Sequence, residues 1–504
     1  TGKRHDARAD WQVGYSDTGQ ITAIAMDFAL RCGCWVGESQ EAADRLMLHA
    51  DNAYFLPSAR IAVQSLRTYT VANAAFRGFG ASKSILTIET IMQGLAAKTG
   101  FDALDVRKAN LYGHHGTQTP YGMAVDSSVT GRRIIEQLEK SADYRARRQQ
   151  IARFNESSTI LKKGLALTPV KFGISFTEQH LNQAGALIHL YPDGSVHLVH
   201  GGTELGQGLY SKVAQIVADE LGVPLSLIHH GATRTDKVPN ASPTAASASS
   251  DLNGMAARNA ALTLRSRLAA FIAEAFKCST VDIHFANGSV QIGDQTKSFA
   301  DVVRLAYQAR VQLSASGFYK TPKLEWDRTR KSGRPFYYFV WGAACSEVVI
   351  DTMTGESKVL RTDILHDVGH SLNPALDRGQ IEGAFMQGLG WLTSEELVFD
   401  TQGRLRTHAP SSYKIPVASD VPEIFTVTLW QEPNDEATIY RSKGVGEPPM
   451  LLAVSVFCAL MDALASLAPG KIVTLDAPAT PEAILRAIEA LADGEALPHD
   501  QEEH

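Results

Sequence analysis

The most constraining feature of this sequence is an apolar segment near its C-terminal end. The pattern of residues 448–467 predicts a helix with apolar side chains almost all round, and such a helix must be buried inside the protein. Its most apolar part, Met450–Met461, is shorter than the roughly 20 residues that a membrane-spanning helix needs. The chain has 504 residues, 44% of them hydrophobic, so it can enclose such a helix in a large core.

The other expected elements are strands and helices that do not alternate regularly. Strands over Trp11–Tyr15 and Ile21–Phe28 are expected to pair around a turn at Asp17-Thr18-Gly19. Further predictions are helices over 82–98, 132–154, 211–221 and 256–277, hairpins of 186–190 with 196–200 and of 347–351 with 358–365, and a strand over 425–430. This order favours an α+β fold over a doubly wound α/β fold.

Composition excludes several classes of protein. The net charge is -6, without a basic excess, so neither nucleic acid nor a membrane surface is expected as a partner. The charged residues at the start are not followed by an apolar segment, so no signal peptide is expected. An odd, scattered set of cysteines argues against a disulfide framework and an iron–sulfur site, and fits a reducing cytoplasm. These cysteines are Cys32, Cys34, Cys278, Cys345 and Cys458.

Glycine-rich loops recur along the chain without a Walker motif or a dinucleotide-binding fingerprint. They are residues 77–80, 201–208, 387–390 and 444–446. Glycine lets the backbone approach a ligand closely, so several such loops in one chain suggest a single large, polar cofactor. Ordinary turns are the alternative for any one loop.

Glu447 is the strongest candidate for a catalytic residue. Gly444 and Gly446 break regular structure before it, and Pro448 and Pro449 fix the backbone after it, at the start of the apolar helix. A stiffly held carboxylate against an apolar helix suits a general base. The alternative is a carboxylate that is favoured there only by the helix dipole.

Three further segments allow two interpretations each. Residues 242–251 are rich in serine and precede a helix, as in an anion-binding cradle or a flexible linker. Phe79, between two glycines, and Phe176 could stack on a planar ring, although phenylalanines are usually core residues. Arg45 lies among acidic residues, where an ordinary surface ion pair is the default expectation.

Taken in order, these segments closely resemble the xanthine dehydrogenase/xanthine oxidase family of molybdenum hydroxylases. In some bacterial enzymes of this family the molybdopterin-binding part is a separate subunit. The chain is similar to the C-terminal portion of that subunit. It rests on residues 1–5, 76–80, 171–177, 181–187, 201–209, 238–246, 251–254, 372–390 and 442–449. The resemblance implies two elongated α+β subdomains, the first truncated at its N-terminus. We divide the chain at 1–125, a linking helix at 126–160, 161–480, and an end with an acidic tail at 481–504.

The resemblance also implies roles for individual residues. Glu447 matches the catalytic base, and Arg45 matches the arginine that offsets negative charge on the purine in the transition state. Four residues match substrate-binding positions: Phe79, Phe176, Thr177 and Leu181. Nine match positions near the pterin, its phosphate or the metal: Arg77, Phe79, Gly206, Gln207, Thr244, Ala246, Ser247, Ser249 and Gln380. The family's molybdenum carries oxo, sulfido and hydroxo ligands and is held by the pterin dithiolene, so no side chain is expected to ligate it.

The implied reaction is hydroxylation of hypoxanthine and xanthine to urate. Electrons are expected to reach NAD through iron–sulfur clusters and FAD on a partner subunit, in a cytoplasmic dimer of heterodimers. Glu38 and Glu178 depart from the family, because well-known relatives have apolar residues there. A related hydroxylase that acts on an aldehyde or another N-heterocycle is the first alternative. A non-catalytic fragment or assembly subunit is the second.

Overall fold

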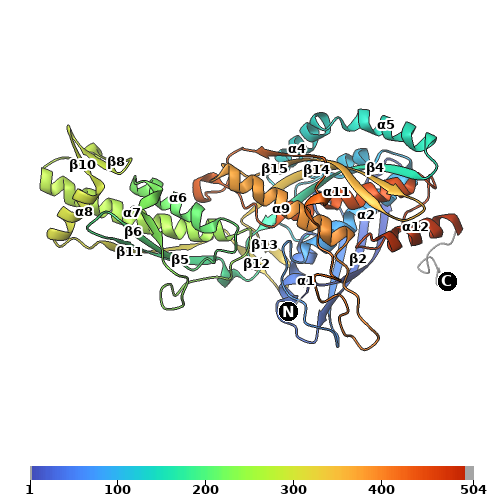
Figure 1. Cartoon of the computed structure of the whole chain (residues 1–504), viewed down its shortest axis with the longest axis horizontal. Coiled ribbons are helices and arrows are strands. Elements are labelled where there is room, and N and C mark those ends of the chain that lie inside the picture. The colour runs from blue at the N-terminus through green and yellow to red at the C-terminus, as the bar shows by residue number, and fades with distance from the viewer. Residues whose placement is uncertain (1–2, 494–504) are drawn as a thin grey trace.

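The computed structural model describes residues 3–493. Figure 1 shows an elongated molecule with two lobes. Residues 183–320 form the smaller lobe, and the segments before and after them form the larger one. Three buried apolar cores fill the molecule, one in the smaller lobe and two in the larger. Helices and strands are mixed without regular alternation, so the predicted α+β class is confirmed.

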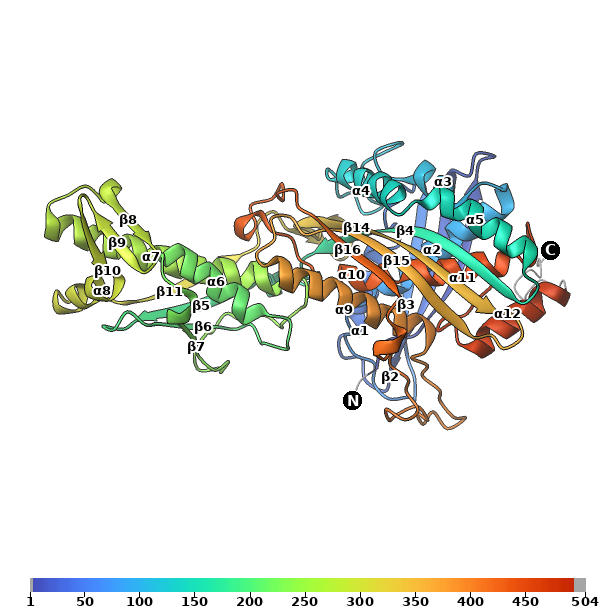
Figure 2. The same ribbon diagram turned by 45° about the horizontal axis from the view of Figure 1, so that its top comes forward.

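A four-stranded sheet forms the middle of the larger lobe (Figure 2). Its strands, in spatial order, are β16 (Ile424–Trp430), β15 (Ser357–Asp367), β14 (Tyr338–Asp351) and β4 (Leu161–Ile174). β14 is antiparallel to both of its neighbours, whereas β15 and β16 are parallel. Residues 338–346 of β14 are all buried, with Phe339 and Trp341 in one core and Tyr338 and Val340 in the other. The strand therefore separates the two cores of the larger lobe.

The apolar segment near the C-terminal end is the centre of one of these cores, as predicted. By length and composition 448–465 could cross a membrane, but 89% of it is buried in the protein. The single expected helix is two, α10 (Pro448–Leu451) and α11 (Val454–Ala465). The chain tightens between them, where Ser455 N and Val456 N donate to carbonyls three residues back. α11 packs against β4 and β14.

The first sheet lies beside this centre and carries the beginning of the chain. The predicted hairpin is confirmed as β1 (Ala7–Tyr15) and β2 (Ile21–Gly33), and β3 (Ala59–Arg67) adds to β2 in parallel. Three helices accompany this sheet: α1 (Ser39–Leu48), α2 (Ala81–Thr99) and α3 (Ala103–Asn110). α1, which carries Arg45, packs against both β3 and α2.

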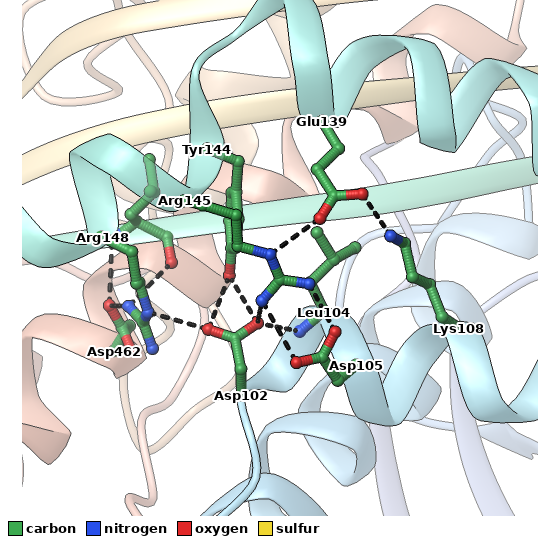
Figure 3. A network of polar contacts seen from close by, with 10 residues as sticks. Asp102, Leu104, Asp105, Lys108, Glu139, Tyr144, Arg145, Arg148 and Asp462 are labelled. Atoms are coloured by element: carbon green, nitrogen blue, oxygen red, sulfur yellow. Dashed lines mark hydrogen bonds and ion pairs between the residues drawn. The ribbon is translucent and has the colours of Figure 1, made fainter.

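The predicted linking helix was wrong in two respects. It is two helices, α4 (Ser128–Ser141) and α5 (Tyr144–Ser157), separated at Asp143, whose φ of 51° breaks the helical path. It is also not a solvated linker, because it packs on the central sheet. Figure 3 shows Arg145 paired with Asp102, Asp105 and Glu139, and Arg148 paired with Asp102 and Asp462. Arg147 pairs with Glu347 and Asp363. These ion pairs connect α5 to other elements of the larger lobe.

The smaller lobe contains the predicted hairpin and both predicted helices. Its sheet has the order β11 (Ser314–Lys320), β5 (Gln183–Leu190), β6 (Val196–His200) and β7 (Ile228–His230). α6 (Leu209–Leu221) and α7 (Ser249–Phe276) pack together, and α7 packs on that sheet. The outer end comprises β8 (Ile283–Ala286), β9 (Ser289–Ile292), β10 (Gln295–Ser298) and α8 (Phe299–Gln308).

The remaining elements connect the lobes and finish the chain. A small hairpin, β12 (Glu325–Asp327) with β13 (Ser332–Arg334), follows the smaller lobe. α9 (Pro374–Thr393) lies against α10 and α11, and α12 (Pro481–Asp493) is the last described helix. The predicted acidic tail from residue 494 lies outside the described residues. The division of the chain at residues 125, 160 and 480 stays a prediction.

Candidate functional site

Glu447 occupies the corner that leads into α10, where the sequence predicted a stiffly held carboxylate. It is only 8% exposed and lies at the N-cap position of a helix whose first two residues are prolines. Its Oε2 accepts a hydrogen bond of 2.6 Å from Ser247 Oγ, and its backbone N–H donates to the same hydroxyl over 3.2 Å. Its side chain makes no capping hydrogen bond to the helix.

The serine-rich segment 242–251 is packed into the protein and is not a flexible linker. Ser247, Ser249 and Asp251 are buried, and α7 begins at Ser249. Gly446 is required here, because a Cβ at this position would overlap the carbonyl oxygen of Ala246. The segment therefore lies directly against the loop that carries Glu447.

Arg77 ties the loop at 76–80 to the same corner. Its Nε donates to Gly446 O, and its Nη2 donates over 3.0 Å to Oε1 of Gln380 in α9. Burial lowers the pKa of Arg77 to about 10, and the charge of Glu447 opposes that shift. Phe79 follows in a left-handed conformation, with φ of 48°.

Arg45 reaches the site from α1 and is 8% exposed. The expectation of a surface ion pair is wrong: the one hydrogen bond of its side chain within residues 3–493 runs from Nη1 to Gly173 O, over 2.6 Å. Its guanidinium lies 5.0 Å from the ring centroids of Phe172 and Phe336. Burial lowers the pKa of Arg45, and the charge of Glu447 opposes that shift.

The predicted substrate residues lie on two different parts of the fold. Phe79 is half-buried against the core of the first sheet, whereas Phe176 packs against the core of the smaller lobe. Asn182 fixes the loop of Phe176, because its Oδ1 accepts from Phe176 N and its Nδ2 donates to Phe176 O. Thr177 is buried, and Leu181 ends a short turn whose carbonyl accepts from Ser242.

A small pocket adjoins Glu447 and collects several of the predicted cofactor residues. Four of them line it: Gln207, Ala246, Ser247 and Gln380. The pocket also contains charged residues that our sequence analysis assigned no role: Lys212, Asp251, Asp377 and Lys443. Lys443 lies in the motif around Glu447, so its place was open to prediction, whereas nothing in the sequence signals Lys212.

The other predicted cofactor residues lie near this pocket without lining it. Thr244 Oγ1 accepts from Thr203 N over 2.9 Å, which joins the serine-rich segment to the loop at 201–208. Gly206 is exposed in that loop, with φ of 96°. Ser249 Oγ donates to Ala245 O over 2.8 Å.

The two acidic departures are each held by a partner. Glu38 Oε2 accepts from Ala75 N, just before the loop of Arg77. Glu178 accepts from Arg328, which also pairs with Asp44 over 2.8 Å. Arg328 lies in the turn between β12 and β13, so this hairpin bridges the residues that neighbour Arg45 and Thr177 in sequence.

Comparison with protein families decides the relationship. Profiles of the molybdopterin cofactor-binding domain match residues 137–422 and 1–111. The chain is also 43% identical over 494 residues to the xanthine dehydrogenase/oxidase of Felis catus, and 39% identical over 498 residues to a nicotinate hydroxylase of Emericella nidulans. These alignments cover 97% of this chain and 36% and 34% of those relatives. The chain belongs to the xanthine dehydrogenase/oxidase family of molybdenum hydroxylases.

Solved structures agree with this fold. The quinoline 2-oxidoreductase of Pseudomonas putida 86 superposes with a TM-score of 0.83 at 23% identity, over 97% of this chain and 63% of that one. The chain spans about a third of the length of its curated relatives. Within this family, the chain has the molybdopterin cofactor-binding domain that the resemblance implied.

The residues around the pocket fit the molybdopterin that the family binds. Ser247 offers a hydroxyl, and Gln207 and Gln380 offer amides for a heterocycle. Lys212 and Lys443 also line the pocket, but each is paired with a buried carboxylate, Asp377 and Asp367. Gly444 and Gly446 bring backbone to the pocket wall without a side chain. Within residues 3–493, no three histidine, cysteine or acidic side chains gather as a metal site.

Proposed function

We propose that this protein hydroxylates hypoxanthine and xanthine toward urate. The observation that carries the proposal is the Arg45 guanidinium, which is buried against the rings of Phe172 and Phe336 and makes one hydrogen bond within the described residues 3–493. A buried cation without a carboxylate partner is costly unless a ligand meets it. A purine oxygen that gains negative charge in the transition state is such a ligand.

Glu447 acts as the general base in this proposal. When bound, the molybdopterin would carry the molybdenum that acts as the two-electron oxidant, and the oxygen that enters the product would derive from water. Glu447 takes the proton of the attacking hydroxyl at Oε1, because its Oε2 is occupied by the hydroxyl of Ser247. Ser247 bonds to both the side chain and the backbone of Glu447, so the carboxylate stays in one orientation.

Arg45 and the two phenylalanines orient the substrate. The remaining N–H groups of Arg45 donate to the purine oxygen, while Phe79 and Phe176 contact the flat ring from opposite cores. The backbone loops of these rings are held separately, by Arg77 in the loop of Phe79 and by Asn182 at Phe176. Planar heterocycles suit this arrangement better than flexible chains.

The resemblance supports further proposals about the whole protein. Iron–sulfur clusters and FAD on a partner subunit carry the electrons to NAD, in a cytoplasmic dimer of heterodimers. The relatives are longer than this chain, which leaves room for these cofactors elsewhere.

Oxidation of an aldehyde or another N-heterocycle is the second candidate. The similarity to a nicotinate hydroxylase, at 39% identity, and to a mouse aldehyde oxidase, also at 39%, favours it. Glu178 and Arg328 add charges near the substrate residues, where an ionised substrate such as nicotinate would meet them.

A substrate panel on the holoenzyme tests the proposal. We expect xanthine and hypoxanthine to be turned over with higher kcat/KM than benzaldehyde or nicotinate, and urate to be the product. Higher kcat/KM for benzaldehyde or nicotinate would contradict a purine hydroxylase. Molybdenum analysis of the same sample distinguishes a weak enzyme from a fragment without cofactor.

A further inference from the structure

His49 is a buried histidine that the proposed mechanism does not use. It follows the last residue of α1, one helical turn after Arg45, and is 1% exposed. Its Nδ1 lies 2.8 Å from the carbonyl oxygen of Arg45, and its Nε2 lies 3.0 Å from the backbone N–H of Gly173. Both ring nitrogens are therefore in use, although no water reaches the ring.

These two partners fix the protonation state of the ring. The Arg45 carbonyl can only accept, so Nδ1 must carry the proton. The Gly173 N–H can only donate, so Nε2 must offer its lone pair. Burial, and then the charges of Arg45 and Lys171, hold the pKa of His49 well below its usual range. The ring is thus one neutral tautomer.

The backbone of Gly173 connects His49 to the side chain of Arg45. Gly173 donates its N–H to His49, and its carbonyl accepts from Arg45 Nη1 over 2.6 Å. The ring of His49 lies 4.8 Å from that of Phe172 and 5.1 Å from that of Phe336. These are the two rings that flank the Arg45 guanidinium at 5.0 Å. His49 and Arg45 therefore share one slot, and Gly173 joins them at its end.

We propose that His49 is a positioning residue that sets the direction of the Arg45 guanidinium toward the substrate. This inference rests on the proposed function, in which Arg45 meets the oxygen of a purine. The two rings confine the guanidinium to a slot, and its one hydrogen bond sets its direction within that slot, so the carbonyl that accepts this bond must itself be fixed. His49 fixes it by holding the N–H of the same residue, Gly173.

This connection also couples Arg45 to the second ring of the site. Gly173 is the second-to-last residue of β4, which ends at Ile174, and Phe176 and Thr177 follow after Ser175. A shift of the Gly173 peptide would therefore move Arg45 and the start of the Phe176 loop together. A misplacement of about 1 Å can lower a rate by about 100-fold.

Three substitutions of His49 in the holoenzyme separate positioning from simple packing. His49→Leu removes both hydrogen bonds. In His49→Gln the amide oxygen reaches the place of Nε2 and keeps the bond to Gly173. In His49→Asn the amide reaches only the place of Nδ1 and keeps the bond to the helix. We measure kcat/KM for xanthine and for benzaldehyde, which lacks the carbonyl oxygens of the purine, with Arg45→Met as the reference.

We expect His49→Leu and His49→Asn to lose roughly 100-fold on xanthine and only a few-fold on benzaldehyde, as Arg45→Met does. His49→Gln should recover most of the xanthine activity. Equal losses on both substrates, or no difference between the Gln and Asn variants, would overturn the inference. If Arg45→Met itself fails to separate the substrates, the proposed function fails and the positioning role is decided by structure alone.

A crystal structure of His49→Gln beside His49→Asn gives that second readout without activity. We expect the Arg45 guanidinium to stay on Gly173 O in the Gln variant and to leave it in the Asn variant. An unmoved Arg45 and Gly173 in the Asn variant would overturn the positioning role whatever the substrate proves to be.

Discussion

Buried cations in the core have carboxylate partners, whereas Arg45 and Arg77 at the site have none among the described residues. In the core, Arg107 and Glu89 pair over 2.7 Å at 1% and 0% side-chain exposure, and Lys171 pairs with Asp51 over 2.9 Å. At the site, Arg45 and Arg77 have only carbonyl and amide oxygens as hydrogen-bond acceptors within residues 3–493.

The difference separates charges that serve folding from charges that serve a ligand. A carboxylate partner neutralises a buried cation, so Arg107 has no charge left for another molecule. A carbonyl orients a cation without neutralising it, so Arg45 keeps its charge for a substrate. The comparison predicts that substitutions at the site change catalysis, whereas substitutions in the core change stability.

The largest expected effect is that of Glu447→Gln on turnover. Loss of the base should lower kcat on xanthine by about 1000-fold, because a positioned general base contributes about 100- to 10,000-fold. The amide keeps an oxygen for Ser247, so molybdenum content and the thermal midpoint should not change. Retained turnover would remove Glu447 from the mechanism.

Arg45→Met should affect the choice of substrate. We expect a loss of about 100-fold or more in kcat/KM for xanthine, comparable to removal of one oxyanion donor, and a small loss for benzaldehyde. Steady-state kinetics on both substrates check this. Equal losses would mean that Arg45 serves the fold, as Arg107 does.

Glu89→Gln tests the core pair and should lower the stability of the protein. It leaves Arg107 charged and buried without its partner, so the apparent free energy of unfolding should fall by about 3–5 kcal/mol. Urea unfolding gives the loss, and kcat at a temperature where the variant is folded should be near the original. A stable variant would show that the pair is dispensable.

Asp251 gives a prediction about pH. Burial raises its pKa to about 7, above the ordinary value of 3.8, although Tyr338 and Lys212 lower it. The folded protein thus holds a proton that the unfolded chain releases, so stability should fall as pH rises from about 4 to about 7, by at most about 1.4 kcal/mol per pH unit. Asp251→Asn keeps an acceptor for Tyr338 and should flatten this slope. Thermal midpoints across this range measure it; an unchanged slope would assign the dependence to other groups.

The smallest effect is expected at an exposed pair. Glu482 and Arg486 pair on α12 at 72% and 75% side-chain exposure. Water and salt screen such a pair, so Glu482→Gln should leave the urea midpoint unchanged within error. It is the matched control for Glu89→Gln, because both remove one carboxylate from an arginine.

Part of the fold was predictable because local signals agreed. The hairpins at Asp17-Thr18-Gly19 and Pro192-Asp193-Gly194 have clear turn residues between apolar strands, and both formed. The strand β14 was predicted only from Glu347, nine residues after its start at Tyr338. Residues 338–346 are buried on both faces, so they lack the alternation that marks a strand.

The predicted helix over 132–154 failed for another reason. Its charges suggested solvent, but Arg147 is buried between Glu347 and Asp363, which lie about 200 residues away. No local pattern reveals whether an arginine has a distant carboxylate. The same limit applies to Arg45, whose sequence neighbours suggested a surface ion pair.

The sequence by itself determined the buried helix, the stiff corner at Glu447 and the family, because prolines, glycines and apolar periodicity act within a few residues. Only the tertiary structure decided which groups meet there: Ser247 on Glu447, Gln380 on Arg77, and His49 with Gly173 around Arg45. These contacts join residues that are far apart in the chain, and their partners are set by how sheets and helices pack.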